Sequence, residues 1–183
     1  MLSEFRKMKL LYLFHSFFDH NSSGNIDKGD FHVALENIAK LRSWTPSDEK
    51  YKETQSALIN IWESLVKTAD TNQDGQVSIE EWLQMWQEYA KNPAKALEWQ
   101  NLYCKFIFDL QDDGGDGSID VEEFANVLQS FGLLKEDSVV AFEFMSRGKK
   151  NISWKEFQEL WKEYFISENP SDPGNYIFGS ATY

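Results

Sequence analysis

Residues 70–81 read Asp-Thr-Asn-Gln-Asp-Gly-Gln-Val-Ser-Ile-Glu-Glu, a run in which oxygen-bearing side chains occupy alternate positions. Oxygen donors at this spacing can wrap around a hard cation. Gly75, at the sixth position, permits the sharp turn that brings them together, because glycine tolerates a left-handed backbone. Glu81, at the twelfth position, can close the shell from the following helix. The stretch therefore predicts a metal-binding loop between two helices.

The same pattern recurs three more times, in residues 19–30, 112–123 and 145–156. It corresponds to the twelve-residue calcium loop of an EF-hand, which loop 70–81 matches at every ligand position. The predicted metal ligands are Asp19, Asn21, Ser23, Asn25, Asp27 and Asp30; Asp70, Asn72, Asp74, Gln76 and Glu81; and Asp112, Asp116, Ser118, Asp120 and Glu123.

The third loop requires a choice of register, because Asp109 could also start a loop. Placing Ile119 at the apolar eighth position makes Asp112 the first ligand and Glu123 the twelfth. This register leaves Gly114 at the third position, where it offers no side-chain oxygen, so a water molecule must fill that place or the site loses a ligand.

The fourth loop, residues 145–156, is degenerate. Met145, Arg147 and Lys149 occupy the first, third and fifth ligand positions, and Lys150 replaces the glycine. Positive side chains in this space would repel a divalent ion. We therefore expect a structural partner of the third loop that binds no calcium.

Apolar residues at helical spacing flank every loop, so each loop is expected to join two amphipathic helices. Before the fourth loop this face is predicted to contain Val140, Ala141 and Phe144, and His15 is expected on the apolar face of the first helix. Ile26 and Val77 hold the eighth position of the first two loops, which suits a short antiparallel contact between them.

The expected fold is all-α, with four EF-hands in two paired lobes that form a compact structure. Residues 1–92 contain loops 19–30 and 70–81, and residues 93–167 contain loops 112–123 and 145–156. Residues 168–183 form a tail in which two prolines and a glycine break the helix before an apolar cluster, Tyr176-Ile177-Phe178. We expect this tail to pack back between the lobes.

Composition excludes several classes of partner. Thirty Asp and Glu against eighteen Lys and Arg give a formal charge of -12, which disfavours nucleic acid and anionic membranes. The single Cys104 cannot form an internal disulfide, and no apolar run reaches the roughly 20 residues of a membrane span. We expect a cytoplasmic monomer without membrane insertion.

Taken together, these features resemble the calexcitin and invertebrate sarcoplasmic calcium-binding protein family of the EF-hand superfamily. The resemblance rests on Asp30 closing the first loop, on residues 82–86 (Trp-Leu-Gln-Met-Trp), on residues 115–120 (Gly-Asp-Gly-Ser-Ile-Asp) and on residues 160–165 (Leu-Trp-Lys-Glu-Tyr-Phe). It implies calcium in loops one to three and a role as a cytosolic buffer or, for calexcitins, in neuronal calcium signalling.

The functional expectation is a calcium buffer or signal modulator that binds up to three Ca²⁺ ions. Mg²⁺ is expected at the first site as well, because Asp30 is one methylene shorter than glutamate and favours six-coordination. One alternative is a sensor that opens on calcium to bind a target protein or a channel segment. Another is a luciferin-binding or photoprotein-like chain. No catalytic set can be placed, so no enzyme activity is expected.

Overall fold

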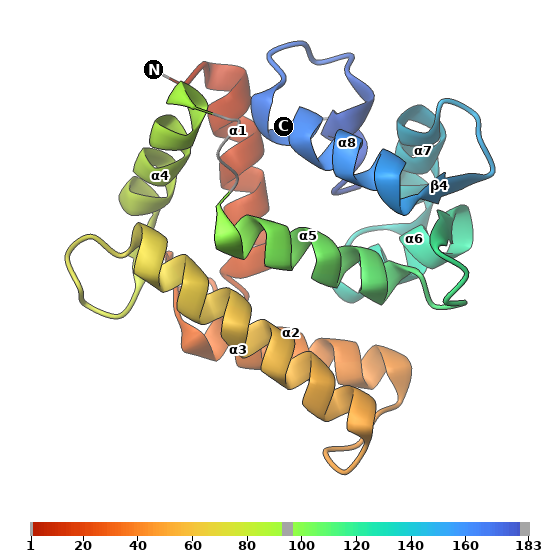
Figure 1. Cartoon of the computed structure of the whole chain (residues 1–183), viewed down its shortest axis with the longest axis horizontal. Coiled ribbons are helices and arrows are strands. Elements are labelled where there is room, and N and C mark those ends of the chain that lie inside the picture. The colour runs from red at the N-terminus through yellow and green to blue at the C-terminus, as the bar shows by residue number, and fades with distance from the viewer. Residues whose placement is uncertain (1, 93–96, 180–183) are drawn as a thin grey trace. The chain divides into compact units, whose positions relative to one another are not determined.

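The computed structural model describes residues 2–92 and 97–179, which form eight α-helices and four short strands (Figure 1). The helices are α1 (Glu4–Leu13), α2 (Lys28–Arg42), α3 (Glu49–Ala69), α4 (Ile79–Lys91), α5 (Glu98–Gln111), α6 (Val121–Ser130), α7 (Lys135–Ser146) and α8 (Trp154–Ile166). The strands are β1 (Asn25–Ile26), β2 (Val77–Ser78), β3 (Ser118–Asp120) and β4 (Asn151–Ser153). This order repeats helix, loop and helix four times, and it confirms the predicted all-α fold.

The chain divides into two units. The first contains residues 1–2 and 9–103, and the second contains residues 3–8 and 104–183. The predicted boundary at Pro93 lies outside the described residues, as do tail residues 180–183. The lobes 1–92 and 93–167 therefore stay a prediction.

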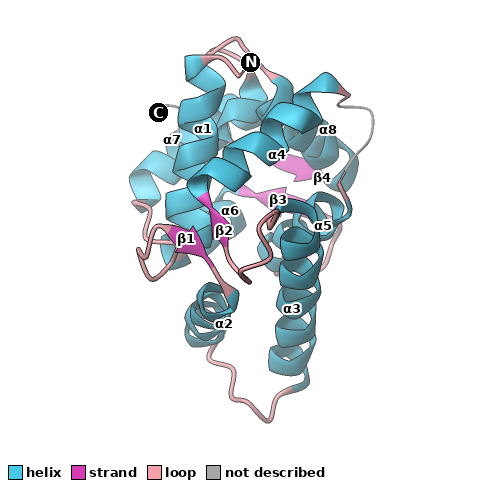
Figure 2. Cartoon of the chain, turned by 90° about the vertical axis from the view of Figure 1, so that its left-hand side faces the viewer, coloured by secondary structure: helices cyan, strands magenta, loops and turns pink. Residues whose placement is uncertain are grey.

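In the first unit, β1 and β2 join the first two loops as an antiparallel pair (Figure 2). Ile26 lies opposite Val77, and both side chains are completely buried. Helix α2 packs on α3, and α3 packs on α4. The Trp82 indole Nε1 donates a hydrogen bond of 2.9 Å to the carbonyl oxygen of Leu10, which joins α4 to α1.

In the second unit, β3 and β4 pair in the same way, with Ile119 opposite Ile152. Helix α6 packs on α7. The predicted inward face of α7 is wrong in two places, because Val140 and Phe144 are more than half exposed. The buried face consists of Ser138, Ala141, Phe142, Met145 and Ser146, so it is rotated away from these two apolar side chains.

The tail packs on helices of the second unit. After α8, a short 3₁₀-helix (Pro173–Tyr176) contacts α7 and α8. Phe178 is 1 % exposed, and its ring centroid lies 4.8 Å from that of Tyr164 and 5.4 Å from that of Trp161. Gly179 has φ 77°, and a Cβ there would come within 2.6 Å of the Leu128 side chain. The tail therefore folds back as expected, while its place between the lobes stays a prediction.

Within the described residues, every helix is too short or too polar to cross a membrane.

Replacing Phe178 with alanine tests whether the tail is part of the core. Because Phe178 fills a fully enclosed aromatic site, we expect Phe178→Ala to lower the free energy of unfolding by about 3 kcal/mol. The variant should also bind more of a dye that reports exposed apolar surface. Leu134→Ala is the matched control, because Leu134 is 65 % exposed. Equal stability of the two variants in urea unfolding would contradict this role.

Candidate metal centres

Loops 19–30, 70–81 and 112–123 share one backbone conformation. The fourth and sixth positions are left-handed in each: Ser22 and Gly24, Gln73 and Gly75, and Gly115 and Gly117. Asp109, the alternative start of the third loop, lies inside α5 and pairs with Lys105. The third loop therefore adopts the geometry of the first two when Asp112 is its first residue.

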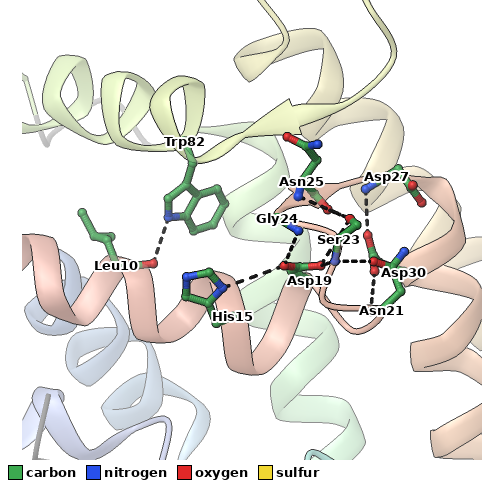
Figure 3. Close-up of polar contacts among 10 residues, drawn as sticks. All are labelled: Leu10, His15, Asp19, Asn21, Ser23, Gly24, Asn25, Asp27, Asp30 and Trp82. Carbon is green, nitrogen blue, oxygen red and sulfur yellow. Dashed lines mark hydrogen bonds and ion pairs between the residues drawn. The ribbon is translucent and has the colours of Figure 1, made fainter.

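The carboxylate at the first position holds the turn of each loop. In loop one, the Asp19 carboxylate accepts hydrogen bonds from the backbone amides of Ser23 (2.9 Å) and Gly24 (3.0 Å) (Figure 3). The corresponding amides donate to Asp70 from Asp74 (3.2 Å) and Gly75 (2.9 Å), and to Asp112 from Asp116 (3.0 Å) and Gly117 (2.9 Å). The sixth residue has a positive φ in all three loops, so the chain turns sharply directly after this amide.

The carboxylate at the twelfth position bridges the two ends of its loop. One oxygen of Asp30 accepts from the amide of Asn21 (3.1 Å), and the other accepts from the amide of Asp27 (2.8 Å). The amides at the equivalent third and ninth positions do the same in the other two loops. Glu81 accepts from Asn72 (3.3 Å) and Ser78 (3.0 Å), and Glu123 accepts from Gly114 (2.9 Å) and Asp120 (3.0 Å). Gly114 thus contributes its backbone amide even though it has no side-chain oxygen.

The ninth residue of each loop caps the helix that follows. Asp27 accepts from the amide of Gly29 at 2.6 Å, and Asp120 accepts from the amide of Glu123 at 2.9 Å. Together with the twelfth residue they form capping boxes at the starts of α2 and α6. These two predicted ligands therefore have a structural task as well. Sequence reasoning missed this role, although residues 120–123 (Asp-Val-Glu-Glu) match the S/T/D-x-x-E pattern that is its usual signature.

The closing carboxylates differ in their electrostatic environment. Burial raises the pKa of Asp30, which has no exposed surface, although the amides of Asp27 and Asn21 counteract the effect. Burial also acts to raise the pKa of Glu81, but hydrogen bonds from Ser78 and Thr71 outweigh it and lower the pKa from 4.5 to about 2. The contribution of Thr71, whose hydroxyl donates to Glu81 at 3.0 Å, was not foreseen from the sequence.

His15 lies beside the first loop. Its Nδ1 is 3.8 Å from the Asp19 Oδ2 atom, and its side chain is 54 % exposed (Figure 3). The expectation that His15 lies on the apolar face of the first helix is therefore wrong. The short π-helix Phe14–Phe18 ends immediately before Asp19 and buries Phe14, Phe17 and Phe18, which leaves His15 on the outer side.

The donor chemistry of the three loops fits a hard cation. Carboxylate, amide and hydroxyl oxygens are the ligands that calcium and magnesium take in proteins. Within the described ranges, no three His, Cys, Asp or Glu side chains converge closely enough to hold an ion by themselves. An ion in any of these loops would therefore also require neutral oxygen ligands. Asn21 and Asn72, at the third position, can supply side-chain amide oxygens, and Ser118, at the seventh position, can supply its backbone carbonyl oxygen.

The fourth loop differs in its backbone and in its charges. Its left-handed residues are Arg147 and Gly148, at the third and fourth positions, and Met145 at the first position is buried in the core. The Lys149 ammonium donates to Oε1 of Glu156, which closes the loop. This hydrogen bond and those from Ser153 lower the pKa of Glu156 to about 2.

Comparison with known proteins identifies the family. The sequence model of the EF hand family matches residues 67–86 and 107–128, which cover loops two and three. Sarcoplasmic calcium-binding proteins I, III and IV of Branchiostoma lanceolatum are 32 % identical over 97 % of this chain and 98 % of their own length. The chain belongs to the sarcoplasmic calcium-binding protein family. The resemblance predicted from its motifs is confirmed.

Two further relatives of the family extend the comparison. Calexcitin-1 of Caenorhabditis elegans is 30 % identical and aligns with 91 % of this chain and 82 % of its own. The solved structure of a sarcoplasmic calcium-binding protein from amphioxus has a TM-score of 0.84 and 30 % identity, and the match covers 98 % of this chain and 99 % of that chain.

Proposed function

We propose that this sarcoplasmic calcium-binding family member binds up to three Ca²⁺ ions, one in each of loops 19–30, 70–81 and 112–123. The observation that carries the proposal is the geometry common to the three loops. In each, the first carboxylate accepts hydrogen bonds from the backbone amides of the fifth and sixth residues. The twelfth carboxylate accepts from the amides of the third and ninth residues. This arrangement supports a site that needs only small rearrangements to wrap an ion.

Reversible coordination is the only chemistry that the proposal requires. The loops gather carboxylates in a chain of net charge -12, and three divalent ions would halve that charge. Binding would therefore relieve repulsion within each loop and stabilise the folded chain. We propose a cytoplasmic, monomeric protein without enzyme activity.

A buffer or signal modulator is favoured over a sensor that opens. Sensors expose an apolar groove when calcium binds. Here Ile177 and Phe178 of the tail are buried against the second unit, which supports a chain that covers its own apolar surface. One observation favours the sensor alternative, with a protein or channel segment as target: Leu134, Val140 and Phe144 of the fourth hand are exposed.

Removing one closing charge tests the proposal directly. We expect Glu81→Gln to weaken calcium binding at the second site by on the order of tenfold or more, because ligand charge sets affinity in EF-hand loops. The amide resonances of Gly24, Gly75 and Gly117 report the three sites separately in a calcium titration followed by NMR. In this variant, only the midpoint of the Gly75 response should move to a higher calcium concentration.

Glu80→Gln is the matched control, since it removes the same charge from the exposed neighbouring side chain. If both variants shift the Gly75 response equally, Glu81 acts only through net charge and the assignment fails. If Gly75 does not respond in the unmodified protein, the proposed site does not bind calcium.

The first site is proposed to accept Mg²⁺ as well. Asp30 makes the same two amide contacts as the longer glutamates, but its shorter side chain is less suited to bidentate coordination. We therefore expect Asp30→Glu to raise the preference of loop one for calcium over magnesium by on the order of tenfold. The reciprocal variant Glu81→Asp should lower the preference of loop two. Competition titrations that leave both preferences unchanged would refute the argument from side-chain length.

A further inference from the structure

The fourth loop holds a cation of its own. The Lys149 ammonium, from the fifth position, donates to one oxygen of Glu156 at the twelfth position. The other oxygen of Glu156 accepts from the Ser153 amide at 2.9 Å and from the Ser153 hydroxyl at 2.6 Å. Both oxygens of the closing carboxylate are therefore engaged.

The other three loops use the same two positions differently. Their fifth residues are Ser23, Asp74 and Asp116, which bear oxygen, and their closing carboxylates accept amides from the third and ninth positions. In the fourth loop the amide of the ninth residue is retained, and the ammonium takes the second oxygen. A positive charge thus comes from a position where the other loops carry an oxygen ligand.

We propose that the Lys149 ammonium acts as a built-in substitute for the metal ion in the fourth loop, and that it thereby strengthens calcium binding in the third loop. The second half of this inference rests on the proposed function of loop 112–123. Lys149 would be a positioning residue, since it acts on the third site through the strand pair.

The link between the two loops is the pairing of β3 with β4. Ser118 lies opposite Ser153, and Asp120 lies opposite Asn151, so two predicted ligands of loop three are in the strand that β4 holds. The Asn151 side-chain amide also donates to the Ser118 hydroxyl at 3.0 Å. Ser153, which Glu156 fixes, ends β4 and caps α8. An ordered fourth loop therefore fixes the position of β3 and of the two predicted ligands in it, Ser118 and Asp120.

Exposure limits the size of the effect. The Lys149 side chain is 63 % exposed and that of Glu156 is 34 % exposed. Ion pairs in such surroundings are screened by water, so their removal changes equilibria by roughly two- to fivefold. An effect of this size is best detected by a measurement that reports on β3 and β4 alone and that compares matched variants.

Amide hydrogen exchange of the full-length, metal-stripped protein in chelator provides that measurement. We expect Lys149→Met to accelerate exchange of the amides in β3 and β4 by about two- to fivefold, because local opening follows the free energy of local contacts. Lys149→Glu places a like charge beside Glu156 and should accelerate it further. The amides of β1 and β2 serve as an internal reference and should not change.

Lys150→Met is the matched control, because Lys150 is the adjacent exposed lysine and makes no ion pair in the described part of the chain. If the amides of β3 and β4 exchange at the same rate in Lys149→Met and Lys150→Met, the proposal that the Lys149 ammonium takes the place of a metal ion is overturned. Glu156→Gln should reproduce the effect of Lys149→Met, and combining the two should add little. Additive effects would likewise overturn the proposed pair.

A calcium titration followed at the Gly117 amide tests the second half. Lys149→Met should weaken this site by about the same two- to fivefold, while Gly24 and Gly75 respond as before. An unchanged Gly117 midpoint would overturn the coupling. If the Gly117 amide resonance of the unmodified protein does not change with calcium, the proposed third site is refuted instead. The hydrogen-exchange comparison would still decide the role of Lys149.

Discussion

The antiparallel contact between paired loops is the constraint on which the rest of each unit depends. Ile26 opposite Val77, and Ile119 opposite Ile152, are buried almost completely in strands of only two or three residues. Such short strands are not stable alone, so the helices on either side must supply the burial that fixes them. In return, the contact fixes two or three residues of each loop, all between the seventh and ninth positions. In the first three loops predicted metal ligands lie within this part of the loop.

Much of this could be predicted from the sequence because the loop motif is strict. A glycine at the sixth position, an apolar residue at the eighth and a carboxylate at the twelfth define register, strand contact and helix start together. The same rule predicts that the third loop starts at Asp112, and in the structure Asp109 lies inside helix α5. The family likeness also followed from residues spread over nearly the whole chain.

Other features depend on details of packing that a linear pattern does not contain. The inward face of α7 is set by how it packs on α6 and the tail, so Val140 and Phe144 could not be assigned from spacing alone. His15 is exposed because a π-helical turn shifts the register of the first helix just before Asp19. The Lys149 contact depends on the left-handed turn at Arg147 and Gly148, whereas the sequence only indicated that positive charges would repel an ion.

We propose that the three loops with a common carboxylate geometry each bind calcium and that the fourth loop does not. Calorimetric titration of the metal-stripped chain with calcium, repeated in a magnesium background, counts these sites. We expect three calcium sites, and magnesium should weaken calcium binding most in the loop that Asp30 closes. Four sites, or none, would contradict it.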